Sequence, residues 1–284
     1  ASVLHRSGFP LSVEREPSVE GSSVCLLSDQ IGWSFDVVNR GLAQVLEAAG
    51  VHVFGHHGME LPLPDADAYF LPWAHPLGFH LPPDRLLGAL RMQSFRQGRQ
   101  GPLRAEDWAW IRRCAAFAVP NRAVYDELVS CGADNRVVYL TNPVDIARFP
   151  ELEARNQEVV ATWAGNAGHK SDPSGDAKGL YSILIPACEN ARVPLRVAEY
   201  HTTRLSPEEM PGFYREASVA VLASAHEGAS CFAMEMMASG LALLATDCGN
   251  IREMYAAQME HYGESGIVIL PRSTGAFTAA LAGL

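Results

Sequence analysis

Residues 219–240 read Val219-Ala-Val-Leu-Ala-Ser-Ala-His-Glu-Gly-Ala-Ser-Cys-Phe-Ala-Met-Glu-Met-Met-Ala-Ser-Gly240 and combine the features from which the fold can be inferred. The first five of these residues are apolar and predict a buried strand. Ser230 is a helix-capping residue and Gly240 a residue type that ends helices, so we expect a helix over 230–238. A strand, a tight turn and a helix in this order predict that the helix begins at the carboxyl end of the strand.

Two carboxylates flank the predicted helix start. A helix N-terminus offers unpaired N–H groups and a positive dipole, which suit a diphosphate. Glu227 precedes this position, and Glu235 follows it by about one helical turn, where its carboxylate can accept hydrogen bonds from a ribose diol. The alternative is that Glu227 is a solvated turn residue and Glu235 a surface helix residue. Against it, Glu235 lies in an apolar segment, where a charge needs a partner. We therefore predict a nucleotide-binding site.

Outward from this segment, apolar strands alternate with amphipathic helices, the pattern of a parallel α/β sheet. In the second half we expect strands at 159–164, 195–198, 219–223, 242–245 and 266–270, with helices at 178–190, 207–216, 230–238, 251–259 and 274–284. In the first half we expect strands at 24–27, 51–54, 68–71, 115–119 and 137–140, with helices at 35–49, 85–95, 105–114 and 122–131. The pattern predicts two Rossmann-like domains, 1–150 and 151–284, with the boundary just beyond the chain-turning Asn142-Pro143.

The composition excludes several classes of protein. The 284 residues are 48% hydrophobic and carry a formal charge of −10, which argues against nucleic acid and weakly against an anionic membrane surface as partners. The six cysteines form no CxxC pair, which disfavours a zinc site and fits free thiols in a reducing compartment. No apolar run approaches the ~20 residues that span a bilayer. We expect a cytoplasmic location.

At Glu227 and Glu235 the chain resembles the retaining glycosyltransferases of the GT-B fold often called family 4, whose signature is Glu, seven residues, Glu. Gly228 also matches, as do the flanking runs 210–224 and 238–253. The resemblance implies a GT-B fold, with two Rossmann-like domains whose parallel sheets face across a cleft. It implies sugar transfer from a nucleotide-diphosphate sugar with retention of configuration. No metal and no cofactor beyond this co-substrate are implied.

The resemblance also assigns residues. Glu235 would hold the donor ribose, while Glu227 and the backbone amides of the turn would meet the donor sugar and diphosphate. These amides belong to Ala229, Ser230, Cys231 and Phe232, and Gly228 is a further donor-binding residue. The family's Gly-Arg followed by Lys-Gly, which neutralises the diphosphate, corresponds to Gly165-Asn166 and Lys178-Gly179. Asn166 replaces the arginine. The phosphate charge is therefore expected to rest on Lys178, with Lys170 as a further candidate or an ordinary loop residue.

The first half carries weaker matches. Asn142-Pro-Val-Asp145 resembles the family's linker segment Asn-Gly-Val-Asp, and Gly32 lies where the family has a turn approached by the donor phosphate. His75 follows a strand at the position of a family histidine that touches the donor sugar; an ordinary loop histidine is the alternative. Asp65-Ala-Asp67 mimics a metal-binding motif but precedes its strand, so we interpret it as turn residues and expect no metal.

These observations predict a retaining glycosyltransferase with Glu227, His75 and Lys178 as catalytic residues and a hydroxyl acceptor bound by an abbreviated first domain. A catalytically weak sugar-nucleotide-binding or accessory protein of the same fold is one alternative. A GT-B-fold epimerase or phosphorylase is another. A dinucleotide oxidoreductase is set aside, because no GxGxxG follows a strand. The nucleotide, the sugar, the acceptor and the oligomeric state are not specified by the sequence.

Overall fold

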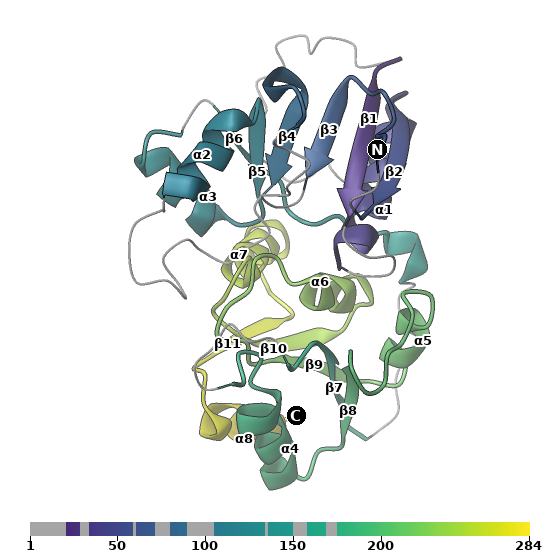
Figure 1. The fold of residues 1–284 in the computed structure, drawn as a ribbon. Helices are drawn as coiled ribbons and strands as arrows, with labels where there is room; N and C mark the ends of the chain where they lie inside the picture. Colours follow the sequence, from purple (N-terminus) through teal and green to yellow (C-terminus); the bar gives the residue numbers. More distant parts are fainter. Residues whose placement is uncertain are drawn as a thin grey trace.

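The computed structural model describes residues 21–28, 34–58, 61–71, 80–89, 105–133, 136–149, 158–168 and 175–284. Three of the predicted site residues, Gly32, His75 and Lys170, lie outside these ranges. The predicted boundary between residues 150 and 151 also falls outside them. The described residues build two α/β units, which we call the first unit (21–149) and the second unit (158–284), each around one parallel sheet (Figure 1).

The first sheet has six parallel strands in the order β2-β1-β3-β4-β5-β6. The strands are β1 (Ser23–Ser28), β2 (His52–His57), β3 (Ala68–Leu71), β4 (Leu86–Ala89), β5 (Ala116–Val119) and β6 (Val137–Tyr139). Three α-helices and two short 3-10 helices accompany them: α1 (Ser34–Ala48), η3 (Pro83–Arg85), α2 (Ala105–Arg113), α3 (Arg122–Ser130) and η4 (Ile146–Arg148).

The second sheet has five parallel strands in the order β11-β10-β9-β7-β8. The strands are β7 (Ala161–Gly165), β8 (Leu195–Glu199), β9 (Val219–Leu222), β10 (Ala242–Thr246) and β11 (Ile267–Leu270). The helices are η5 (Leu180–Leu184), α4 (Ile185–Ala191), α5 (Met210–Tyr214), α6 (Cys231–Ala238), α7 (Ile251–Tyr262) and α8 (Thr274–Ala282).

Both sheets share one topology, in which the chain order reverses beside the first strand of each sheet. The reversal lies between β1 and β3 in the first unit and between β7 and β9 in the second. In open parallel sheets, ligands bind outside the carboxyl ends of the strands at such a switch point. The topology therefore directs attention to the ends of β7 and β9, where the predicted donor residues begin.

Strand β9 shows why the second sheet is apolar throughout. Alternate residues of a strand face opposite sides of the sheet. Val219 and Val221 pack with η5, α4 and α8, whereas Ala220 and Leu222 pack with α6 and α7. Figure 1 shows α6 and α7 on the face turned toward the first unit and α4 and α8 on the opposite face. Because helices cover both faces, the strand is a continuous hydrophobic run.

One predicted element of the first half is wrong. The predicted helix over 85–95 contains strand β4, which pairs with β3 and β5; residues 90–95 lie outside the described ranges. Gly88 explains the close packing at this strand, since a Cβ there would lie 2.5 Å from the Cys114 sulfur and 2.8 Å from the Phe117 ring. Short apolar runs such as Leu-Leu-Gly-Ala fit a strand or a helix equally well by periodicity alone.

Helix α1 holds the segment after β6 and also reaches the second unit. A Cβ on Gly41 would lie 2.8 Å from Cγ of Pro143, so this segment lies directly against the helix, and Gln44 donates a hydrogen bond of 3.4 Å to Asp145. Both of these contacts lie within the first unit. Arg40, on the same helix, lies 3.5 Å from Glu208 of the second unit.

None of the described helices is both long and apolar enough to cross a bilayer.

Candidate active site

The turn between β9 and α6 forms as the sequence predicts. Ser230 has extended backbone angles and its hydroxyl accepts a hydrogen bond from the Ala233 N–H at 3.2 Å, which makes it the N-cap of α6. At the other end, Gly240 has a left-handed φ of 69°, and the Leu241 N–H reaches back to the Met236 carbonyl at 3.0 Å. The positive end of the α6 dipole thus lies at the carboxyl end of β9.

Glu227 and Lys178 meet at this turn. The Lys178 ammonium donates to Oε1 of Glu227 at 2.5 Å, and the Ser224 hydroxyl donates to the same oxygen at 2.7 Å. The side chains are only 18% and 12% exposed for the lysine and the glutamate, so the pair is shielded from most of the solvent. The fold brings together two predicted site residues that are 49 positions apart in the sequence.

The loop that carries Lys178 is fixed by close backbone contacts. The Ala225 N–H donates to the Ala177 carbonyl at 2.8 Å. Gly179 has a φ of +69°, and a Cβ there would lie 2.5 Å from the Ala223 carbonyl oxygen. Only glycine combines this backbone conformation with this approach. Lys178 is therefore held against the end of β9 by its two neighbours in the chain.

Asp176 starts the helix that follows. Its buried carboxylate accepts hydrogen bonds from the N–H groups of Leu180, Tyr181 and Ser182, at 3.1, 3.0 and 2.7 Å. These groups belong to the first turn of η5, a π-helix, where backbone donors lack intrahelical partners. Arg272 donates to the carbonyls of Asp176 and Ala223, at 2.7 and 2.9 Å, and so fastens the loop to β9.

Glu235 lies one turn into α6 and is held by a buried tyrosine. The Tyr214 hydroxyl, on a side chain that is 1% exposed, donates to Oε2 of Glu235 at 2.6 Å. Burial raises the pKa of Glu235, while this hydrogen bond and the Arg148 charge lower it. Burial, together with the Glu235 charge, raises the pKa of Tyr214 well above its ordinary value, so the phenol stays protonated as the donor.

Gly165 and Asn166 lie at the end of β7, beside the switch point. Gly165 closes the strand, and its carbonyl accepts from the Tyr200 N–H at 3.0 Å. The Asn166 side chain turns back on its own loop, where Oδ1 accepts from the Gly168 N–H at 2.9 Å. Asn166 therefore brings no positive charge to the position where the family has an arginine.

Sequence reasoning missed three residues that hold the turn. The buried Asn121 amide donates to the Gly228 carbonyl at 3.0 Å, and the buried Asn250 Oδ1 accepts from the Ser230 N–H at 3.3 Å. Gly249, with a φ of +57°, lies so close that a Cβ would be 2.7 Å from the Gly228 oxygen. Asn142, noted before only as a linker residue, donates to the Ala229 carbonyl at 2.8 Å.

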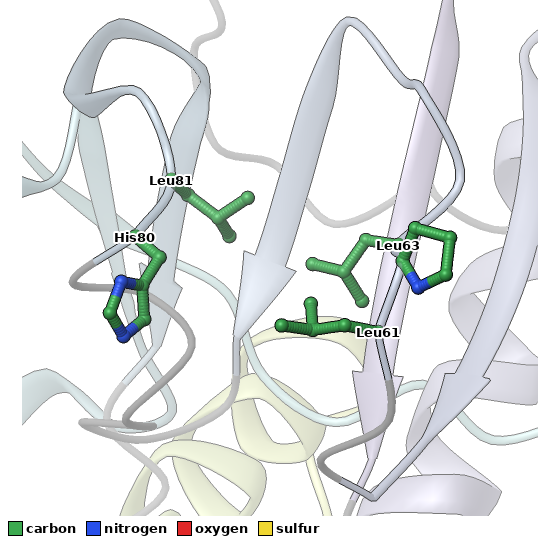
Figure 2. A pocket seen from close by; sticks show the side chains of 5 residues that line it. Leu61, Leu63, His80 and Leu81 are labelled. Atoms are coloured by element: carbon green, nitrogen blue, oxygen red, sulfur yellow. The ribbon is translucent and has the colours of Figure 1, made fainter.

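A separate hollow of about 450 Å³ lies in the first unit. Its described lining residues are Leu61, Pro62, Leu63, His80 and Leu81. Figure 2 shows the leucine side chains pointing toward one another. This apolar lining offers little to a diphosphate, and no predicted donor-site residue belongs to it. We therefore place the candidate active site at the turn of the second unit.

The two aspartates of the Asp65-Ala-Asp67 segment, which mimics a metal-binding motif, have different partners. Asp67 accepts hydrogen bonds from the N–H and the hydroxyl of Ser23, both at 2.8 Å, and these bonds lower its pKa. The Asp65 side chain is 98% exposed and lies 3.5 Å from Arg85. In the part of the chain that the structure describes, no three His, Cys, Asp or Glu side chains gather as a metal site would require.

Comparison with known structures places the fold. HepE of Anabaena, in complex with UDP and glucose, matches 92% of this chain and 89% of its own at 11% identity and a TM-score of 0.60. AviGT4, a glycosyltransferase involved in avilamycin A biosynthesis, matches 93% and 89% at 14% identity and a TM-score of 0.58. TarM of S. aureus matches at 13% identity and a TM-score of 0.54, and this chain spans only 43% of its length.

The two parallel sheets and these neighbours define a protein of the GT-B fold. In sequence, residues 146–284 match the family described as "Glycosyl transferases group 1". The matched residues include the Glu227–Lys178 pair and Glu235. No curated protein matches the chain.

Proposed function

We propose that this protein is a glycosyltransferase that moves a sugar from a nucleotide-diphosphate sugar to a hydroxyl acceptor, with retention of anomeric configuration. One observation carries the proposal: a shielded lysine is paired with Glu227 in the turn that precedes α6, at the switch point of a sheet whose residues match the group 1 glycosyl transferases. A fixed cation and a helix N-terminus together favour a bound diphosphate.

In this proposal Lys178 and the N–H groups at the start of α6 stabilise the diphosphate as it departs. Preorganised charges and dipoles of this kind commonly supply a large share of the rate enhancement. Lys178 exchanges its partner from Glu227 to phosphate when the donor binds, and Glu227 then accepts hydrogen bonds from the donor sugar. Since Asn166 adds no charge, Lys178 bears most of this task, with Lys170 as a further candidate.

Glu235 recognises the ribose of the donor. Tyr214 occupies Oε2, which leaves Oε1 for a ribose hydroxyl. The tyrosine also fixes the orientation of the carboxylate, so less side-chain freedom is lost when the nucleotide binds. Gly32, Gly165 and Asn166 would line the phosphate side, and His75 would touch the sugar. For the acceptor proton, the departing phosphate is the proposed base, because Glu227 would be engaged by the donor sugar and by Ser224.

UDP is the first nucleotide to test. HepE and TarM, two of the structural neighbours, are known as complexes that contain UDP. The acceptor would bind on the first unit, and no resident metal or other cofactor is part of the proposal. The six free cysteines are consistent with the cytoplasmic location that we also propose.

A thermal-shift panel with UDP, dTDP, GDP and ADP tests the nucleotide claim. Ligands that bind only the folded state raise its melting temperature, by an amount that grows with concentration over Kd. We expect one nucleotide to stabilise the protein, and its sugar derivatives to be hydrolysed slowly without an acceptor. NMR of the released or transferred sugar then reports the anomer. If none of the four stabilises the protein, the donor site is rejected.

A further inference from the structure

We infer that Asn121 is a positioning residue, which ties the donor turn to the first unit and so makes nucleotide affinity depend on the contact between the two units. The inference rests on the proposed function, since it concerns the same turn. It adds a residue from outside the matched residues 146–284, 107 positions before the backbone group that it holds.

Asn121 uses both ends of its amide. The side chain is fully buried; its Oδ1 accepts from the Val124 N–H at 2.9 Å and caps α3, while its Nδ2 donates to the Gly228 carbonyl at 3.0 Å. The first bond is internal to the first unit, and the second crosses to the second unit. A single planar group therefore connects the start of α3 to the turn before α6.

Peptide geometry explains how the bond from Asn121 to Gly228 orients an amide that is proposed to meet the donor. In a trans peptide the carbonyl and the next N–H point in opposite directions. Holding the Gly228 oxygen thus fixes the direction of the Ala229 N–H, one of the amides proposed to meet the donor. Asn142 does the same one peptide further on, because its bond to the Ala229 oxygen fixes the Ser230 N–H, which donates to Asn250.

A second contact secures the same region of the boundary. Glu253 of α7 accepts hydrogen bonds from the Arg122 N–H at 2.5 Å and from the Tyr139 hydroxyl at 3.1 Å. Arg122 is the residue after Asn121, so the start of α3 is held by the turn and by α7 together. The Asn121 bond therefore belongs to a built interface between the units, and a change in that interface moves the turn.

Asn121→Asp separates positioning from helix capping. Aspartate caps helices as well as asparagine does, so the bond to Val124 is kept. It has no N–H to donate, and it brings a carboxylate oxygen against the Gly228 carbonyl. Asn121→Ala removes both bonds. As a matched control, Asp145→Asn makes the reverse exchange at the cap of η4, where Oδ1 accepts from the Ala147 N–H and the partners of the side chain lie within the first unit.

The experiment measures UDP affinity by calorimetry and amide hydrogen exchange of residues 226–236 without ligand. For Asn121→Asp we expect about tenfold weaker UDP binding, as an unsatisfied buried group predicts, with faster exchange in the turn and unchanged exchange in α3. Asn121→Ala should also speed exchange in α3, and Asp145→Asn should leave UDP affinity and the turn as in the wild type.

Different outcomes would contradict the positioning role of Asn121 and the proposed donor. Wild-type affinity together with wild-type exchange of the turn in Asn121→Asp overturns the positioning inference. If the wild-type protein itself does not bind UDP, the proposed donor fails, but the exchange measurement still decides whether Asn121 holds the turn: faster exchange supports the tie and equal exchange rejects it.

Discussion

The two units share a strand order but differ in the polar groups that lie at the carboxyl ends of their strands. In the first unit, Ser28 at the end of β1 hydrogen-bonds to Nδ1 of His57 at the end of β2 at 2.8 Å, and the buried Asp36 lies 3.9 Å from Nε2 of that histidine. In the second unit, the Lys178–Glu227 pair lies beyond the end of β9. The same topology therefore supports two different polar clusters.

The cations of the two clusters differ in exposure. Arg40 bonds to Asp36 at 2.6 Å, but its side chain is 47% exposed, whereas that of Lys178 is 18% exposed. A charge that is shielded from water acts more strongly on a neighbouring anion. The fold therefore provides a position for a charge, while the loop sequence determines how far that charge is shielded from solvent.

Replacing the enclosed cation of the second unit should have the largest effect. For Lys178→Ala we expect kcat/KM for the donor to fall by at least ~100-fold, the scale of losing one preorganised group at a developing charge. Steady-state donor hydrolysis measures this. Arg40→Ala, the matched change at the more exposed cation of the first unit, should lower the same kcat/KM much less. Equal losses in the two variants would contradict the distinction.

Glu235→Ala should weaken nucleotide binding by about tenfold, because a hydrogen bond to a charged group is lost. Titration with UDP measures the effect, and circular dichroism checks the fold. Tyr214→Phe should give a smaller loss, since it removes only the bond that orients the carboxylate. An alanine variant that binds UDP as tightly as the wild type would reject the ribose role.

Gly249→Ala should lower stability by about 1–3 kcal/mol, since a left-handed backbone is strained for alanine and its Cβ would lie 2.7 Å from the Gly228 oxygen. Urea denaturation measures the change. Gly212→Ala is the control, because a Cβ on Gly212 in α5 meets nothing within 4 Å. If both variants lose equal stability, the packing of Gly249 against the turn is not the cause.

The smallest effect should come from Glu253→Gln, at the boundary between the units. Burial raises the pKa of Glu253 above its ordinary 4.5, so the folded state binds this proton more tightly than the unfolded state does. Its contribution therefore favours folding at low pH and is lost as pH rises through the raised pKa. Urea denaturation at a series of pH values around the pKa of Glu253 should show that stability declines less steeply with rising pH in the variant than in the wild type. An identical pH dependence in the two proteins would contradict this role of Glu253.

The sequence predicts local structure well where local chemistry decides it. The apolar run before Ser224, the Ser230 cap and the end of α6 at Gly240 all follow from residue types. The single helix predicted over 178–190 instead begins as the π-helix η5 and continues as α4. Asp176 gathers three backbone donors at its start, an arrangement that hydrophobic periodicity does not reveal.

The candidate site was only partly predictable. Family resemblance singled out Glu227, Glu235 and Lys178, and the fold brings the first and the last together. Asn121 shows the limit, since an asparagine before a helix predicts a cap and nothing more. Its second bond depends on how the two units pack, which no local pattern of residues encodes.

The contact of Gly41 with Pro143 has a mechanical consequence. With no side chain on Gly41, the segment after β6 lies directly against α1, which fixes the position of Asn142, the residue before the proline. Asn142 donates to the Ala229 carbonyl of the second unit at 2.8 Å. A side chain at position 41 would therefore displace this segment, and with it a hydrogen bond that holds the turn proposed to bind the donor.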